Sequence, residues 1–187
     1  MIDNKPQTGL PVLDKLLGIH QQLVYRNNIS SNTILNMANL DKDYFTSVAA
    51  ALLTLGTIHA PIVQTVSLLR DVNYEQTVES ILSSPGSGKV PGWGSDFVKG
   101  ESDPIFDEID QCISNHEVYD KILHITELLH DNNKIIYPNA ACYTAACSII
   151  IKLPDAIAPY LLIKGRLEGW TDVYLKSKTA GSDSSAG

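Results

Sequence analysis

The chain has 187 residues, of which 44% are apolar and 19% are charged, a composition typical of one globular domain with a sizeable core. Its formal net charge of −7 argues against a basic surface, so neither nucleic-acid binding nor adhesion to anionic membranes is expected. No apolar run is long enough to span a membrane, and residues 1–5 lack the features of a signal peptide, so we expect a cytoplasmic protein.

The predicted elements are all helices. After a polar lead-in over residues 1–9, Pro11 suits the first turn of a helix whose apolar residues recur at helical spacing. Ser30 or Ser31 can cap a second helix. This second helix is predicted to run to about residue 40, and further helices are predicted over residues 43–55, 61–69, 74–82, 104–113, 117–130, 140–151 and 154–176. No segment alternates at period two, so the predicted class is all-α, with at least about 55% helix.

The third predicted helix, which Asp41 or Asp43 can cap, is unusually apolar. Its run Val48–Leu53 is apolar nearly all round, and a helix of this kind must be buried on several sides. One small domain has difficulty covering that many faces.

A long loop is predicted between residues 83 and 104, because its first half holds four glycines and two prolines. Gly88-Lys89 does not complete a phosphate-binding loop, since Ser83 and Val90 stand where that motif needs Gly and Ser or Thr. Long loops in compact domains often carry function.

Neither a metal site nor a disulfide framework is predicted. No two histidines have the spacing that places both imidazoles on one helix face. Cys112, Cys142 and Cys147 lie on apolar helical patterns without a Cys-x-x-Cys pair, which indicates buried free thiols.

Three segments, in order and at compatible distances, resemble the signature of the citrate synthase family. The first is the apolar run from Tyr44 to Leu52 with Gly56-Thr57-Ile58-His59, similar to an apolar helix followed by Gly-Pro-Leu-His-Gly. The second is Val90-Pro91-Gly92-Trp93-Gly94 with Asp103-Pro104, similar to Val-Pro-Gly-Phe-Gly and Asp-Pro-Arg. The third is Tyr137-Pro138-Asn139-Ala140-Ala141, similar to Tyr-Pro-Asn-Val-Asp, followed further on by Gly165-Arg166.

The resemblance implies an all-α homodimer that closes over oxaloacetate and acetyl-CoA. The helical domain would comprise residues 10–178, with a smaller lid over roughly residues 71–150. Residues 179–187 have the composition of a flexible Gly/Ser tail.

The resemblance also implies which residues would act. In the family, one histidine holds the enolised acetyl-CoA oxygen, a second polarises the oxaloacetate carbonyl, an aspartate removes the methyl proton and arginines grip the carboxylates. His59 falls on the first histidine and Arg166 on one carboxylate-binding arginine. Ser95 replaces the second histidine, Ala141 the aspartate and Ile105 the arginine after Asp-Pro.

These replacements argue against citrate synthesis. An alanine accepts no proton, and losing a positioned base typically costs about 10²- to 10⁴-fold in rate. Asp96, Glu101 and Asp103 also line the loop that would receive a dianion. Synthesis would require another carboxylate, such as Asp96 or Glu168, to act as the base.

The retained residues leave ligand binding open. Gly92, Trp93, Gly94, Asn139 and Arg166 are candidate ligand-binding residues, and a coenzyme A ester is the one cofactor that the resemblance suggests. The alternative is structural: the glycines permit unusual backbone conformations, Trp93 fills space, and His59 and Arg166 are satisfied core groups.

The leading interpretation is therefore a catalytically inactive, citrate-synthase-like homodimer that acts as a scaffold or interaction protein, conceivably in a virus particle. One alternative is a reduced enzyme that condenses or cleaves an acyl-CoA ester with a 2-oxo acid, with His59 as the surviving oxyanion-stabilising or acid group. The other is a regulatory module that binds coenzyme A or a carboxylate.

Overall fold

The computed structural model describes residues 10–26, 28–55, 61–85, 89–95 and 97–183. Its α-helices are α1 (Pro11–Leu23), α2 (Ile29–Asn39), α3 (Tyr44–Leu53), α4 (Ile62–Arg70), α5 (Tyr74–Ser83), α6 (Asp107–Ile113), α7 (Glu117–Asp131), α8 (Ala140–Ile150) and α9 (Pro159–Asp183). Two short 3-10 helices, η1 (Pro104–Phe106) and η2 (Asp155–Ile157), precede α6 and α9. The structure is 71% helical with no strand in its described part, which confirms the all-α prediction.

Side chains before the helices explain where several of them begin. The Asp43 carboxylate accepts a hydrogen bond from the Thr46 amide and caps α3, one of the two caps expected there. Asn28, rather than Ser30 or Ser31, caps α2 by accepting from the Ser31 amide. The two serines thereby lie inside the first turn, where both are buried.

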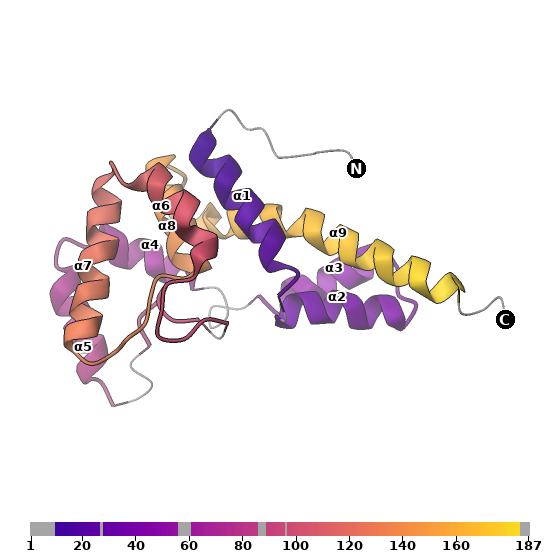
Figure 1. Ribbon diagram of the computed structural model, residues 1–187, viewed down its shortest axis with the longest axis horizontal. Helices are drawn as coiled ribbons and strands as arrows, with labels where there is room; N and C mark the ends of the chain where they lie inside the picture. Colours follow the sequence, from indigo (N-terminus) through magenta and orange to yellow (C-terminus); the bar gives the residue numbers. More distant parts are fainter. Residues whose placement is uncertain (1–9, 27, 56–60, 86–88, 96, 184–187) are drawn as a thin grey trace.

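The helices form an elongated molecule (Figure 1). Helices α4 to α8 gather at one end, and the long helix α9 runs from this group toward the other end, where it packs against α2 and α3. Helix α1 crosses α9 and joins the two ends. The main core comprises apolar residues of α1 and α4 to α9, and a smaller cluster surrounds Trp170 with Val24, Ile34 and Ala51.

Two glycines of α9 permit its close approach to α1. A Cβ atom at Gly165 would lie 2.5 Å from the His20 Cβ and 3.0 Å from the Leu17 carbonyl oxygen. A Cβ at Gly169 would lie 2.9 Å from the Val24 side chain. The contact between these helices therefore depends on the absence of side chains at both positions.

Helix α9 continues to Asp183, beyond the point where the sequence composition predicted a flexible tail. Near its C-terminal end, α9 contacts the end of α2 and the turn that follows α2. Ser177 donates a hydrogen bond to the Asn39 side chain, and Lys178 forms an ion pair with Asp41. Ser177 and Lys178 lie just before the predicted tail.

Helix α3 is less buried than its apolar sequence predicted. Only Ser47 and Ala51 are buried, whereas Phe45 is 82% exposed and Leu53 is 88% exposed. Ala49, midway between these two residues, is also exposed. Phe45, Ala49 and Leu53 follow each other at intervals of four residues, so they form one apolar stripe on the helix, which we call the α3 stripe.

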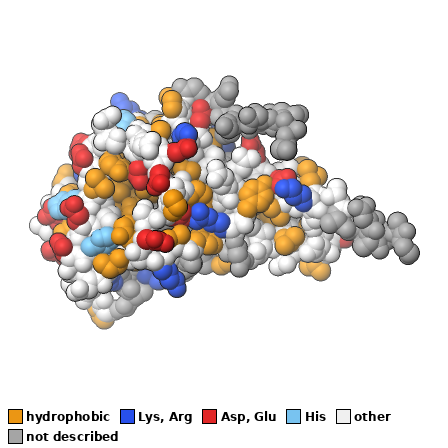
Figure 2. Space-filling view, in the orientation of Figure 1, with side chains coloured by type: hydrophobic (Ala, Val, Ile, Leu, Met, Phe, Trp, Pro, Cys, Tyr) orange, Lys and Arg blue, Asp and Glu red, His pale blue; other side chains and the backbone are white. Residues whose placement is uncertain are grey.

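Other expectations concern cysteines, charge and membranes. All three cysteines are free, but only Cys142 and Cys147 are buried. Figure 2 shows Lys and Arg side chains scattered among acidic ones on the face drawn, without a continuous basic area. Within the described ranges, no helix has the length and apolar character needed to cross a membrane.

Candidate functional site

Arg166 is a cation without an acidic partner among the described residues. It lies on α9 and is partly buried, and its Nη1 donates a 3.0 Å hydrogen bond to the Ser30 hydroxyl. Its buried Nε has no hydrogen-bond partner in the part of the chain that the structure describes. Burial lowers the pKa of Arg166 to about 10, so the guanidinium remains charged at neutral pH.

His20 lies beside Arg166 in a fully buried position on α1. Its Nε2 lies 2.7 Å from the Thr144 hydroxyl, which itself donates to the Ala140 carbonyl. His20 therefore donates from Nε2, and Nδ1 is unprotonated. Burial first, and the charge of Arg166 second, lower the pKa of His20 to about 3, so the ring is neutral at physiological pH.

The first turn of α2 and its cap, Asn28, support Arg166. The Ser30 hydroxyl donates to the Asn28 side-chain oxygen at 2.8 Å, which leaves the Ser30 oxygen free to accept from Arg166. The Asn28 amide nitrogen donates to the carbonyls of Leu23 and Arg26 at 2.9 and 2.8 Å. Ser31 adds a buried hydroxyl that has no partner among the described residues.

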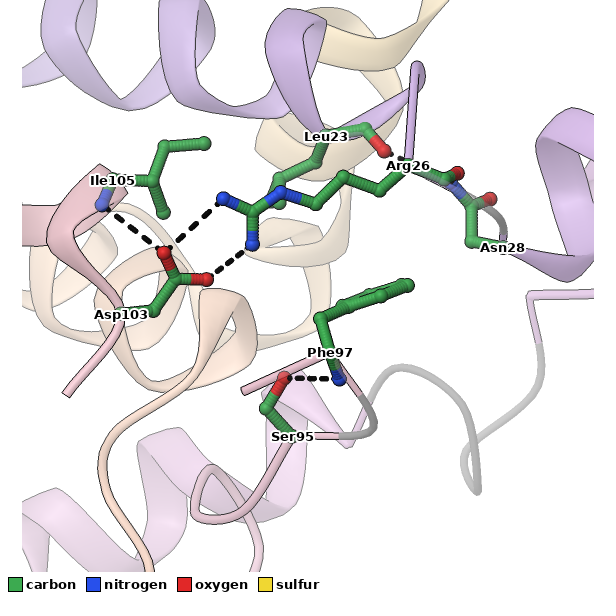
Figure 3. Close-up of polar contacts among 7 residues, drawn as sticks. All are labelled: Leu23, Arg26, Asn28, Ser95, Phe97, Asp103 and Ile105. Carbon is green, nitrogen blue, oxygen red and sulfur yellow. Dashed lines mark hydrogen bonds and ion pairs between the residues drawn. The ribbon is translucent and has the colours of Figure 1, made fainter. Parts of the chain in front are cut away.

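Figure 3 shows a second arginine, Arg26, between Asp103 and Phe97. Its two terminal nitrogens contact both Asp103 oxygens, with Nη2 donating to Oδ1 at 3.1 Å. The guanidinium carbon lies 5.9 Å from the centre of the Phe97 ring. Burial alone would raise the pKa of Asp103, but hydrogen bonds from Arg26 and from the Ile105 amide outweigh it and lower this pKa below its ordinary value.

The Arg26–Asp103 pair changes how the predicted site is charged. Asp103 was expected to repel a dianionic ligand together with its acidic neighbours, but Arg26 neutralises it. Ile105 brings no charge, and its amide helps Asp103 to cap η1. Arg26 thus places a guanidinium near the position where the sequence lacks an arginine, but that guanidinium is already bound to a carboxylate.

Among the described residues, the positions expected to hold the proton-accepting aspartate and the second histidine carry Ala141 and Ser95. Ala141 is buried in the first turn of α8, and its amide donates to the Asn139 side chain. The Ser95 hydroxyl accepts from the Phe97 amide (Figure 3). His59 and Asp96 lie outside the described residues. Glu168, the other carboxylate considered as a base, is exposed on α9.

The candidate ligand-binding loop is held by bonds within the protein. Gly92 and Gly94 both adopt φ of +89°, and a Cβ at Gly92 would lie 2.5 Å from the Thr65 side chain. Trp93 is buried and donates to the Thr126 hydroxyl, so its ring is not available to stack on a base. The Asn139 amide donates to the Gly94 carbonyl and its side-chain oxygen caps α8.

Comparison with solved structures identifies the architecture. The citrate synthase of Thermotoga maritima MSB8 matches with a TM-score of 0.71 and 21% sequence identity over 88% of this chain and 47% of that one. The fold is that of citrate synthase. A citryl-CoA lyase from Hydrogenobacter thermophilus matches with a TM-score of 0.69 and 17% identity, over 90% of this chain and 70% of that one.

These likenesses extend to the fold alone. The chain spans about half the length of the Thermotoga citrate synthase. No family model and no curated protein matches the sequence. Among the described residues, no group of three or more His, Cys, Asp or Glu side chains is placed to hold a metal ion.

Four of the residues around Arg166 and Asp103 were not identified as site residues from the sequence. His20 continues the apolar spacing of Leu16 and Leu17, which could have indicated that it is buried. Arg26 and Asn28 lie between α1 and α2 and Ser30 lies in the first turn of α2, where nothing in the sequence pattern indicates which partner each side chain meets.

Proposed function

We propose that this protein uses the citrate synthase fold to bind a small carboxylate without condensing it with acetyl-CoA. The observation that carries the proposal is Arg166, a partly buried guanidinium with an unpartnered Nε and no ion pair within the described ranges. A binding function of this kind was one of the alternatives left open by the sequence.

The energetics favour an anionic ligand at Arg166. Removing a charge from water is costly unless an opposite charge or hydrogen bonds compensate, and the lowered pKa of Arg166 reflects this cost. Among the described residues, its one hydrogen-bond partner is the neutral Ser30 hydroxyl. A carboxylate is the natural counter-ion because its two oxygens match the guanidinium fork.

The residues argue against catalysis. Ala141 offers no proton acceptor, and Ser95 offers a weaker donor than an imidazolium would. The second candidate is an enzyme acting on an acyl-CoA ester, which the likeness in fold to a citrate synthase and a citryl-CoA lyase favours. The comparisons lend no support to a scaffold or a viral role.

Calorimetric titration with citrate, oxaloacetate and acetate tests the proposal. We expect saturable binding of at least one of them to the wild type and a loss of at least about tenfold in affinity for Arg166→Gln, since a charge-assisted bidentate contact contributes about 1.5–3 kcal/mol. Arg70→Gln is the matched control, because Arg70 pairs with Asp155 elsewhere on the surface. Equal binding by the wild type and Arg166→Gln would refute the assignment, as would no binding to the wild type.

We also infer that two copies associate through the α3 stripe. Phe45 and Leu53 leave large apolar areas in water, and covering such area contributes about 25 cal/mol per Å². A symmetric dimer would cover the stripe of each copy with the other. The apolar sequence of this helix then has a physical reason that a single chain does not supply.

A further inference from the structure

Two buried polar atoms with complementary hydrogen-bonding roles belong to the contact between α1 and α9. The Nε–H of Arg166 is a donor, and the unprotonated Nδ1 of His20 is an acceptor. Neither atom has a hydrogen-bond partner among the described residues, although His20 is fully buried. Because a buried donor or acceptor left unpaired is costly, both atoms need a partner.

The packing of the two helices places these side chains next to each other. Helix α1 crosses α9 (Figure 1), and a Cβ at Gly165, the residue before Arg166, would lie 2.5 Å from the His20 Cβ. Burial lowers the pKa of His20 first, and the charge of Arg166 lowers this pKa further, as expected for neighbouring groups. The two side chains therefore share one buried region without a direct hydrogen bond between them.

Thr144 determines which nitrogen of His20 can accept a hydrogen bond. The Thr144 hydroxyl donates to the Ala140 carbonyl at 2.6 Å, so it can only accept from His20 Nε2, which lies 2.7 Å away. The ring therefore carries its lone pair at Nδ1. Since burial lowers the pKa of His20 to about 3, the ring keeps this lone pair at neutral pH.

Water is the small molecule that suits both unpaired atoms. Its oxygen accepts from the Arg166 Nε–H while one of its protons is donated to His20 Nδ1, and buried waters have about two to four polar partners. A carboxylate cannot serve both atoms because it has no proton to donate to Nδ1. A cation would be repelled by the guanidinium.

We propose that a buried water joins His20 Nδ1 to Arg166 Nε, and that His20 is thereby a positioning residue for the carboxylate-binding guanidinium. The inference rests on the proposed function. Ser30 holds Nη1 of Arg166, and the water holds Nε, so two separate contacts fix the plane of the group. Nη2 and the second proton of Nη1 remain for the carboxylate, whose charge is still required because water brings none.

Two substitutions of His20 separate positioning from packing. Asn carries its side-chain oxygen on Cγ, as His carries Nδ1, so His20→Asn keeps the acceptor for the water but loses the bond to Thr144. Gln extends one bond further, so the nitrogen of His20→Gln can reach Thr144, but no acceptor remains at the position of Nδ1. Positioning predicts citrate binding at least about fivefold weaker for His20→Gln and changed by less than about twofold for His20→Asn. Packing predicts the reverse order, because Gln is closer to His in size.

The experiment is calorimetric titration of citrate into the wild type, His20→Gln, His20→Asn and His124→Gln, with circular dichroism to establish that each is folded. His124 is the matched control, because it lies on α7 and contacts Tyr74. Weaker binding by His20→Gln than by His20→Asn, with His124→Gln unchanged, supports the proposal. Equal binding by the two His20 variants, or the reverse order, overturns the positioning role and leaves the proposed function intact.

A high-resolution crystal structure of the wild type tests the water independently of any ligand or variant. We expect a water within about 2.7–3.2 Å of both His20 Nδ1 and Arg166 Nε. A direct bond between the two side chains, or no density for a water between them, overturns the bridge. If the wild type binds none of the carboxylates tested, the proposed function and the positioning role fall together, whereas the water is judged by the crystal structure alone.

Discussion

The contact between α1 and α9 gives a quantitative stability prediction for Gly165→Ala. The new Cβ would lie 2.5 Å from the His20 Cβ, well inside the ordinary contact range of 3.4–4 Å, and 3.0 Å from a backbone oxygen of Leu17. Neither obstacle is the flexible end of a side chain, so the helices must separate. Overpacking of this kind costs about 1–3 kcal/mol, and separation would also loosen the packing around the buried His20.

The opposing term is helix propensity, because alanine is about 1 kcal/mol better than glycine inside a helix. Since both obstacles lie close to the backbone, we expect the clash to dominate and the variant to lose about 1 kcal/mol net, with a melting temperature lower by about 2–4 °C for a chain of this size.

Gly18→Ala is the matched control. Gly18 lies on α1, and a Cβ at this position would meet no atom within 4 Å. The same substitution should therefore raise stability by about 0.5–1 kcal/mol. Urea unfolding followed by circular dichroism measures both effects. If Gly165→Ala were as stable as Gly18→Ala, the close packing of α1 against α9 would be wrong.

Three further predictions concern pH, assembly and catalysis. His20 in the unfolded chain binds a proton below its ordinary pKa of 6.5, whereas in the folded chain its pKa is about 3. The free energy of unfolding should therefore fall by about 1.4 kcal/mol for each pH unit below 6.5. His20→Gln should lose less stability than the wild type between pH 6.5 and 4.5, and equal losses in urea unfolding would contradict the burial of a neutral ring. Light scattering should show that the wild type is a dimer and that the double variant Phe45→Glu/Leu53→Glu is a 20.4 kDa monomer. Val72→Glu, at an exposed site away from α3, should remain dimeric. A monomeric wild type would refute the interface. The protein mixed with acetyl-CoA and oxaloacetate should release no free thiol above background. Ala141→Asp alone should not restore thiol release, because Ser95 still replaces the carbonyl-polarising histidine and Ile105 the carboxylate-binding arginine. Rescue by this one change would require withdrawing the non-catalytic assignment.

The sequence by itself determined the helices and much of what the site lacks. Helical spacing, Pro11 and the Asp43 cap depend on residues within a few positions of one another, so their effect can be inferred without a fold. The unreactive side chain of Ala141 is equally independent of tertiary structure. The backbone conformations of Gly92 and Gly94 also agree with expectation, since both have positive φ.

Only the tertiary structure decided which polar groups meet. Arg26 and Asp103 are far apart in the sequence, as are His20 and Thr144, and no local pattern distinguishes their pairing from exposure to solvent. Asn28, Ser30 and Ser31 all suit a helix N-terminus, but contacts with Arg166 and the end of α1 accompany the choice of Asn28 as the cap. The free energy of a buried charge depends on partners brought together by the whole fold, whereas helix formation depends largely on neighbours along the chain.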